Sequence, residues 1–292
     1  KLPAEKGNAV AQYYLGTMYE DGTGVNQDYK EAVRWYRLAA EQGFAPAQTN
    51  LGRLYREGNG VSQDYKEALR LFRLSAKQKH EGAYFNLSEM YYEGEGVPQD
   101  LKKAAQWCKR AAKQGNVNAH TMLGLLYSLG GKGLAQDNKE AVKWFKLSAN
   151  EGNASAQSLL GQIFEKGLGF PQDYVEAFKW YQLSAIQGYA LSQLTLGEKY
   201  YHGKGLQQDY AEAIKWFKLS AEQGLKDAQY NLAVIYYNGQ GVEQDYEEAF
   251  KRYHLLALEG HAKSRYNLGL MYYRGKGVQQ NYKAAFKWFK LS

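Results

Sequence analysis

Residues 11–46, AQYYLGTMYEDGTGVNQDYKEAVRWYRLAAEQGFAP, decide the fold, because their pattern recurs to the end of the chain. An alanine or serine opens each copy, at the positions Ala11, Ala47, Ala83, Ala119, Ala156, Ser192, Ala228 and Ser264. Successive starts lie 36 residues apart, except that 37 residues separate Ala119 from Ala156, because Gly130-Gly131 adds one residue to a loop. Self-similarity at this period indicates a stack of small, similar units. Eight repeats fill the chain, and we expect no separate catalytic domain.

Each copy begins with the pattern of a short amphipathic helix. Ala11, Leu15 and Tyr19 stand at i, i+4 and i+8, which places them on one helix face. Gly16 lies beside them, although glycine inside a helix costs about 1 kcal/mol relative to alanine. Every copy keeps a small residue at this position: Gly52, Ser88, Gly124, Gly161, Gly197, Ala233 and Gly269. We therefore predict that another backbone comes close to the first helix here.

A glycine-containing loop then ends the first helix. Gly22 and Gly24 supply backbone angles that other residues resist. This Gly-x-Gly is not a nucleotide-binding signature, because no strand precedes it, no third glycine completes it and no Gly-Lys-Ser/Thr occurs in the chain.

The second helix carries start and stop signals. Asp28 is the expected N-cap and Glu31 its partner in a capping box. Trp35 and Tyr36 belong to the buried stripe, and Gly43 is the left-handed stop. The same acidic pair recurs as Asp64/Glu67, Asp137/Glu140, Asp173/Glu176, Asp209/Glu212 and Asp245/Glu248. Capping explains these carboxylates without any catalytic role.

The sequence therefore predicts an all-α fold, a right-handed superhelical solenoid of eight helix-turn-helix repeats in which residues 1–292 form a single domain. Residues 1–10 match the end of a repeat and are interpreted as a truncated preceding repeat. At Ser292 the chain stops where sister repeats continue, so both ends indicate a cut through a longer protein. Exposed apolar ends favour end-to-end self-association.

Composition excludes several classes of site. One cysteine rules out an internal disulfide framework, and Cys108 falls at a position that is aromatic in the other repeats, so we predict a buried, inert thiol. The five histidines show no metal-ligand spacing, and no serine or cysteine has the setting of a nucleophile. No run of 18 apolar residues occurs, so we expect no transmembrane segment. We expect neither an enzyme nor a cofactor or metal.

The consensus Ala-Gln-x-x-Leu-Gly-x-x-Tyr-x-x-Gly-x-Gly-Val-x-Gln-Asp-Tyr-x-x-Ala-x-x-Trp-Tyr-x-x-Ala-Ala-x-Gln-Gly resembles the Sel1-like repeat (SLR), a relative of the tetratricopeptide repeat (TPR). The match covers nearly the whole chain. Local departures are Ser88 for glycine, Leu71 and Arg252 for tryptophan, and Leu101 and Asn138 for the tyrosine after aspartate. The resemblance implies a non-enzymatic adaptor that holds proteins together. In bacteria it implies exported, periplasmic or host-facing proteins associated with virulence, while a cytoplasmic location stays open.

The resemblance also implies where a partner binds, because the first helix of each tetratricopeptide unit lines the concave side. Its outward positions become apolar and aromatic in the last three repeats. The predicted partner-binding residues are Leu194, Tyr201, Tyr230, Val234, Tyr237, Tyr266, Leu270 and Tyr273, together with Tyr92 in the third repeat. Tyr201, Tyr237 and Tyr273 share one repeat position and should form a ladder of favoured interface side chains. That these rings pack between helices instead stays an alternative. The expected partner is a protein, either a peptide segment or a folded domain.

The charge and the repeat architecture suggest two other functions. The formal charge of +7 suggests RNA, which some helical repeats bind. However, cations of the second helix can pair with capping glutamates, as Arg34 with Glu31, and the predicted groove contains acidic residues that would repel phosphate. These acidic residues are Glu20, Glu89, Glu165 and Glu198. Nucleic-acid binding is therefore disfavoured. A structural role in a multiprotein envelope or secretion assembly stays an alternative.

Overall fold

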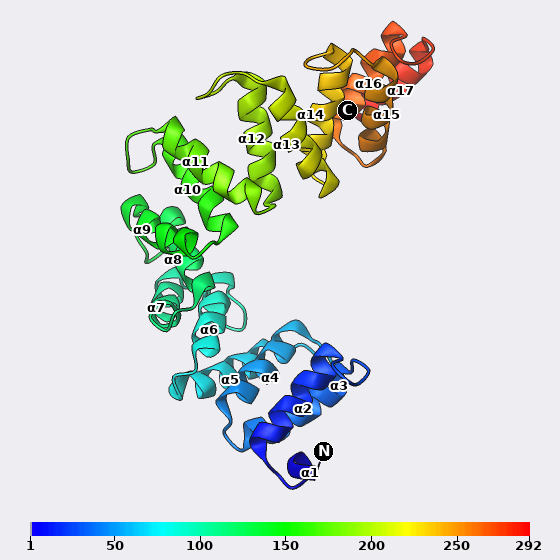
Figure 1. Ribbon diagram of the computed structural model, residues 1–292. Helices are drawn as coiled ribbons and strands as arrows, with labels where there is room; N and C mark the ends of the chain where they lie inside the picture. The colour runs from blue at the N-terminus through cyan, green and yellow to red at the C-terminus, as the bar shows by residue number, and fades with distance from the viewer. Residues whose placement is uncertain (1) are drawn as a thin grey trace. The chain divides into compact units, whose positions relative to one another are not determined.

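The computed structural model describes residues 2–292, which form seventeen helices (Figure 1). The chain divides into two compact units, residues 2–151 and 152–292. The helices of the first unit are α1 Leu2–Glu5, α2 Ala9–Asp21, α3 Tyr29–Glu41, α4 Ala45–Glu57, α5 Tyr65–Lys77, α6 Glu81–Glu93, α7 Leu101–Ala112, α8 Val117–Leu129 and α9 Asn138–Asn150. Those of the second unit are α10 Ala154–Lys166, α11 Tyr174–Ile186, α12 Ala190–His202, α13 Tyr210–Glu222, α14 Lys226–Asn238, α15 Tyr246–Leu258, α16 Ala262–Arg274 and α17 Tyr282–Leu291.

Two kinds of helix alternate within each unit. The even-numbered helices α2 to α16 are the first helices of the eight repeats, and the odd-numbered helices α3 to α17 are the second helices. Each first helix packs on the second helix of its own repeat, and within a unit each second helix packs on the first helix of the next repeat. The predicted all-α solenoid of helical repeats is confirmed. That residues 1–292 form one domain stays a prediction, and Lys1 of the predicted truncated repeat lies outside the described residues.

The Gln-Asp pair of each repeat closes the loop between the two helices. The Gln63 amide donates to the carbonyl of Arg56 at 2.8 Å, and the Asp64 backbone N–H donates to the carbonyl of Tyr55 at 2.9 Å. The Asp64 carboxylate in turn accepts from the backbone N–H groups of Lys66 and Glu67. Loop closure and helix capping thus depend on two adjacent side chains, which explains why the pair recurs.

The predicted capping box forms only in part. Asp28 caps α3 as expected, with its carboxylate accepting from the N–H groups of Lys30 and Glu31. The reciprocal bond from the Asp28 N–H does not go to Glu31, because that N–H donates to the carbonyl of Tyr19 at 2.8 Å. Glu31 instead forms an ion pair with Arg34 at 3.2 Å.

The small residue in the first helix has a steric cause, but not the predicted one. A methyl group placed on Gly124 would lie 2.5 Å from the Phe145 ring, so the close neighbour is an aromatic side chain and not a backbone. The same relation holds for Gly16 with Tyr36, Gly52 with Phe72, Gly161 with Tyr181, Gly197 with Phe217 and Gly269 with Phe289. Each ring comes from the second helix of the same repeat and packs over the glycine.

The third repeat changes both members of this pair. Ser88 replaces the glycine and Cys108 replaces the ring, and both side chains are fully buried. The Ser88 hydroxyl donates to the carbonyl of Ala104 at 2.9 Å and is also a hydrogen-bond neighbour of the Cys108 thiol. A smaller second-helix side chain therefore coincides with a larger first-helix side chain. The prediction of a buried thiol at Cys108 is confirmed.

The inserted residue of the fourth repeat is accommodated in a bridged loop. Gly131 and Leu134 exchange two backbone hydrogen bonds, of 2.8 and 3.0 Å. A Cβ atom on Gly131 would lie 2.6 Å from Leu101, the residue that replaces the usual tyrosine. Two departures from the consensus thus meet at one place in the first unit.

Candidate functional site

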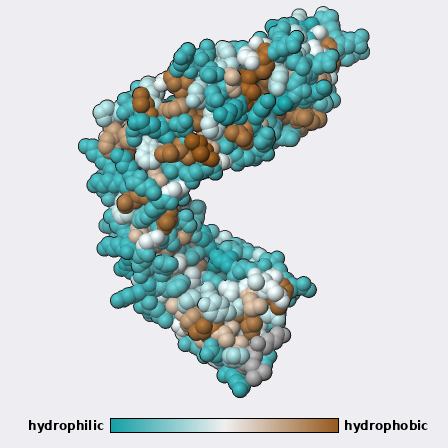
Figure 2. All heavy atoms as spheres, viewed as in Figure 1, coloured by the Kyte–Doolittle hydropathy of each residue, from teal (hydrophilic) through white to brown (hydrophobic). Residues whose placement is uncertain are grey.

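Most of the predicted partner-binding residues lie on three first helices of the second unit. Leu194 and Tyr201 belong to α12, Tyr230, Val234 and Tyr237 to α14, and Tyr266, Leu270 and Tyr273 to α16. Tyr92 lies on α6 in the other unit, so the structure does not group it with them. Tyr266 and Tyr273 are 52% and 53% exposed, whereas the other residues of the set are half-buried. Hydrophobic side chains appear as separate patches on a largely hydrophilic surface (Figure 2).

Four of these residues line one pocket between α14 and α16. Tyr230, Val234, Tyr237 and Leu270 surround a volume of about 240 Å³, which we call the Tyr230 pocket. Its other lining residues are Asn238, Tyr253, Asn267 and Arg274. Apolar and aromatic walls with a few polar groups are typical of a binding pocket, although this one is smaller than most ligand sites.

Hydrogen bonds fix one wall of the Tyr230 pocket. The Asn267 amide donates to the Tyr230 hydroxyl oxygen at 3.1 Å, and the Tyr230 ring packs on Tyr253 with 5.7 Å between centroids. Burial raises the pKa of Tyr253 far above its ordinary value, so this phenol stays protonated. Arg274 is exposed and has no ion-pair partner within residues 2–292. The pocket therefore combines an ordered aromatic wall with an unpaired cation.

The three ladder tyrosines each pack against the tyrosine that begins the second helix of their own repeat. The edge-to-face pairs are Tyr201 with Tyr210, Tyr237 with Tyr246 and Tyr273 with Tyr282, with ring centroids 5.5, 5.1 and 5.3 Å apart. These rings thus have intramolecular packing partners, and Tyr273 also keeps half of its surface exposed.

A contact between neighbouring repeats was missed in the sequence. The residue between the two loop glycines reaches back to the ladder position of the preceding repeat. Gln240 accepts a hydrogen bond from the Tyr201 hydroxyl at 2.5 Å, and the Lys276 ammonium lies 5.3 Å from the Tyr237 ring centroid. In the first unit, Arg56 donates to Glu95 at 2.6 Å in the same way. The sequence does contain a signal for this contact, because the two partners stand 39 residues apart in each case.

Three of the acidic residues in the predicted groove form ion pairs with neighbouring cations. Glu20 is only 8% exposed, accepts a hydrogen bond from Tyr36 and forms an ion pair with Arg53. Glu89 pairs with Arg56, and Glu165 pairs with Lys199 at 2.8 Å. Two of these cations are shared, because Arg53 also pairs with Glu57 and Arg56 also pairs with Glu95. That acidic groups of the groove repel phosphate therefore stays a prediction.

One cation on each of five second helices is paired with a capping glutamate, as expected. Five capping glutamates form i,i+3 ion pairs: Glu31–Arg34, Glu67–Arg70, Glu140–Lys143, Glu176–Lys179 and Glu212–Lys215. Such exposed pairs contribute little to stability, about 0.2–1 kcal/mol each. They do reduce the positive field that nucleic-acid binding would need.

The described residues show neither a metal cluster nor a membrane span. Within residues 2–292, no three or more histidine, cysteine, aspartate or glutamate side chains gather to hold a metal ion. No helix in that range combines the length and the apolar character needed to cross a bilayer.

Comparison with known families and structures identifies the repeats. The Sel1 repeat matches residues 9–44, 45–80, 82–116, 117–153, 154–189, 190–225, 226–261 and 262–292. The chain therefore belongs to the Sel1 repeat family. Sel1 repeat proteins are generally non-catalytic scaffolds that bind other proteins. No curated protein matches the chain.

Two solved structures resemble the chain over nearly its whole length. A Sel1 repeat protein from Oxalobacter formigenes is 31% identical, with a TM-score of 0.74, and the match covers 99% of this chain and 83% of that one. A protective antigen present in uropathogenic Escherichia coli strains, which displays an SLR fold, is 35% identical with a TM-score of 0.53. That match covers 99% of this chain and 69% of the antigen.

Proposed function

We propose that this chain is a non-enzymatic adaptor that binds a protein partner along the first helices α12, α14 and α16. The observation that supports this proposal is the Tyr230 pocket, because it gathers four of the apolar or aromatic residues that were predicted to bind a partner. The Sel1 repeat family supports the same class of function, since its members typically bind proteins.

The chemistry of the pocket indicates what kind of segment binds there. Tyr230, Val234, Tyr237 and Leu270 offer an apolar site for one side chain, and aromatic anchors of this kind often dominate interface energetics. Arg274 has no ion-pair partner among residues 2–292, so it can pair with a carboxylate of the partner. We infer a peptide segment of the partner with an apolar anchor beside an acidic residue.

The setting of this interaction follows from similarity alone. The likeness to a protective antigen of uropathogenic Escherichia coli supports the proposal that the chain is bacterial, exported and host-facing. The number of partner segments bound per chain distinguishes an adaptor from a structural component of an envelope or secretion assembly, because an adaptor binds one segment per chain.

The experiment is a pull-down from cells of the source species, in which a double variant of the pocket is compared with a matched control. Arg274→Glu with Leu270→Ala changes one cation and one leucine of the Tyr230 pocket. Lys287→Glu with Leu183→Ala makes the same changes on the second helices α17 and α11. We expect the pocket variant to bind the captured partner at least about ten-fold more weakly, as loss of a hot spot predicts, and the control to bind normally. Equal binding by both folded variants would place the partner on another surface.

A further inference from the structure

A second surface of this protein follows from the tryptophan position of the second helices. Six repeats carry tryptophan there, at Trp35, Trp107, Trp144, Trp180, Trp216 and Trp288, and two carry Leu71 and Arg252 instead. Each of these tryptophans is buried or half-buried in the structure. The two departures are therefore places where a large packed ring is missing.

Trp216 shows what the ring does in an ordinary repeat. It is 8% exposed and packs in one core cluster with Ala185 at the end of α11 and Leu196 on α12. The indole thus fills the space between the second helix of one repeat and the first helix of the next.

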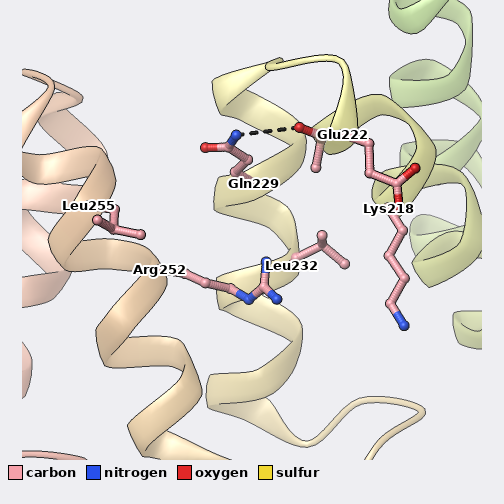
Figure 3. Close-up of a pocket in the computed structure, with 7 residues that line it drawn as sticks. Lys218, Glu222, Gln229, Leu232, Arg252 and Leu255 are labelled. Carbon is pink, nitrogen blue, oxygen red and sulfur yellow. Dashed lines mark hydrogen bonds between the residues drawn. The ribbon is translucent and has the colours of Figure 1, made fainter.

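At the following junction no ring fills that space, which forms an open cleft lined by Arg252. Residues 36 positions further on, Ala221, Leu232 and Arg252, stand where Ala185, Leu196 and Trp216 stand one repeat earlier. They line a cavity of about 530 Å³ together with Lys218, Glu222, Gln229 and Leu255. We call it the Arg252 notch. Figure 3 shows Arg252 reaching from α15 towards Leu232 on α14, with Leu255 and Gln229 on either side of the gap.

The same relation holds in the first unit, where Leu71 replaces tryptophan. A cavity of about 290 Å³ is lined there by Ala40, Leu51, Leu71 and Leu74, which are the repeat equivalents of Ala221, Leu232, Arg252 and Leu255. Two independent junctions that lack the ring therefore both show the cavity.

The Arg252 notch is lined by two cationic side chains, each with donors that have no partner among residues 2–292. The Nε atom of Arg252 is buried and has no hydrogen-bond partner in the described structure, although its Nη2 atom pairs with Glu248 at 2.7 Å. Lys218 has no ion-pair partner among residues 2–292. In Figure 3 the Lys218 side chain extends downward, so that its ammonium lies at about the height of the Arg252 guanidinium, whereas Glu222 lies higher, near the height of Gln229. One end of the notch can thus receive a carboxylate, and its apolar walls can receive a ring.

We propose that the Arg252 notch binds an acidic segment of a partner protein, which inserts an aromatic side chain where the repeat's own tryptophan is missing and places a neighbouring carboxylate against Lys218 and Arg252. The partner's aromatic ring supplies the packing that Trp216 provides at the preceding junction. The partner's carboxylate accepts a hydrogen bond from the Arg252 Nε atom, which has no partner in the described structure. This surface lies between second helices and the first helix α14. The inference does not depend on the Tyr230 pocket.

The test is a titration of the protein with dipeptides, followed by backbone amide NMR. The probes are N-acetyl-Trp-Asp-amide, N-acetyl-Trp-Lys-amide and N-acetyl-Ala-Asp-amide, up to millimolar concentration. We expect saturable shifts of the Leu232 and Leu255 amides with the Trp-Asp probe, with affinity about two- to five-fold lower for Trp-Lys and no saturation with Ala-Asp. Equal responses to all three probes would overturn the proposal.

Two variants separate binding from folding. Arg252→Trp restores the residue of six other repeats, so it should fold and should abolish saturable binding of the Trp-Asp probe. Leu71→Trp is the matched control, because it fills the cavity of the other unit and should leave that binding unchanged. Lys218→Glu alters an exposed side chain and should reverse the preference between the Asp and Lys probes. Undiminished binding to Arg252→Trp, or an unchanged preference in Lys218→Glu, would contradict the proposal.

Discussion

The paired exchange of Ser88 and Cys108 predicts a strong energetic coupling between two helices of one repeat. Elsewhere, a methyl group placed on the glycine would lie 2.5–2.8 Å from the second-helix ring. The variant Cys108→Phe introduces such a ring beneath a serine that is larger than a methyl group. Overpacking of a core typically costs about 1–3 kcal/mol, and we expect this substitution to lower the free energy of unfolding by that amount.

The second substitution should be unfavourable alone and favourable in the double variant. Ser88→Gly removes the hydrogen bond to Ala104 and places glycine in a helix, which costs about 1 kcal/mol. In the background of Cys108→Phe it makes room for the ring and recreates the pair found at Gly124 and Phe145. We therefore expect the double variant to be more stable than the sum of the single effects by about 1–3 kcal/mol.

The assay is a double-mutant cycle in urea, monitored by circular dichroism and by amide exchange of α6 and α7. Local exchange is needed because a repeat array can lose its all-or-none unfolding. Cys108→Phe combined with Ser220→Gly in the other unit is the control and should be additive within about 0.5 kcal/mol. A coupling below that limit for Ser88 and Cys108 would refute the reasoning. In the seventh repeat Ala233 and Tyr253 pack in one core cluster, so a single methyl group is tolerated beside the ring there.

Two further predictions concern ionisable groups. Burial raises the pKa of Cys108 to about 12, so the folded protein should not react with a thiol reagent at pH 8. The urea-unfolded protein should react fully. Rapid labelling of the folded protein would contradict this prediction. Burial of Glu165 opposes its ionisation, but hydrogen bonds from Lys199 and Tyr181 outweigh this and hold its pKa below the ordinary value. The Glu165–Lys199 pair therefore stabilises the second unit at pH values above the ordinary carboxyl pKa of 4.5, and this contribution is lost as the pH falls below that value. The free energy of unfolding of Glu165→Gln should accordingly fall less between pH 6 and pH 3 than that of the wild type.

The repeat architecture could be predicted from the sequence because it depends on local and periodic signals. Glycine pairs and apolar stripes recur in every repeat, and aspartate caps the second helix in seven of the eight, so each element is indicated many times over. The capping box was only half right, because the Asp28 N–H is used to close the preceding loop through Tyr19. Such closure depends on the path of the loop, which the residue types alone do not define.

The surfaces between repeats were harder to predict. Small residues at the Gly16 position correctly indicated close packing, but the neighbour is the Tyr36 ring, a contact between two helices that periodicity does not specify. Likewise, Leu71 and Arg252 were recognisable as departures from tryptophan, yet only the packing of Trp216 shows that their replacement leaves a cavity.

The predicted set of partner-binding residues was only partly brought together. Tyr230, Val234, Tyr237 and Leu270 meet in one pocket, because they lie on facing turns of two adjacent first helices. Tyr201 instead hydrogen-bonds Gln240 of the next repeat, and Tyr92 lies in the other unit. Partner binding by the full set stays a prediction.

The most direct test of the proposed adaptor function is site-specific photo-crosslinking in cells of the source species. A benzophenone amino acid would replace Tyr266 on α16 or Val175 on α11, which are 52% and 62% exposed, so that both reporters are comparably accessible. If the first helices of the second unit bind the partner, the reporter at position 266 will give a discrete protein adduct and the reporter at position 175 will not. An adduct of equal yield at both positions, or at position 175 alone, would contradict binding along α12, α14 and α16.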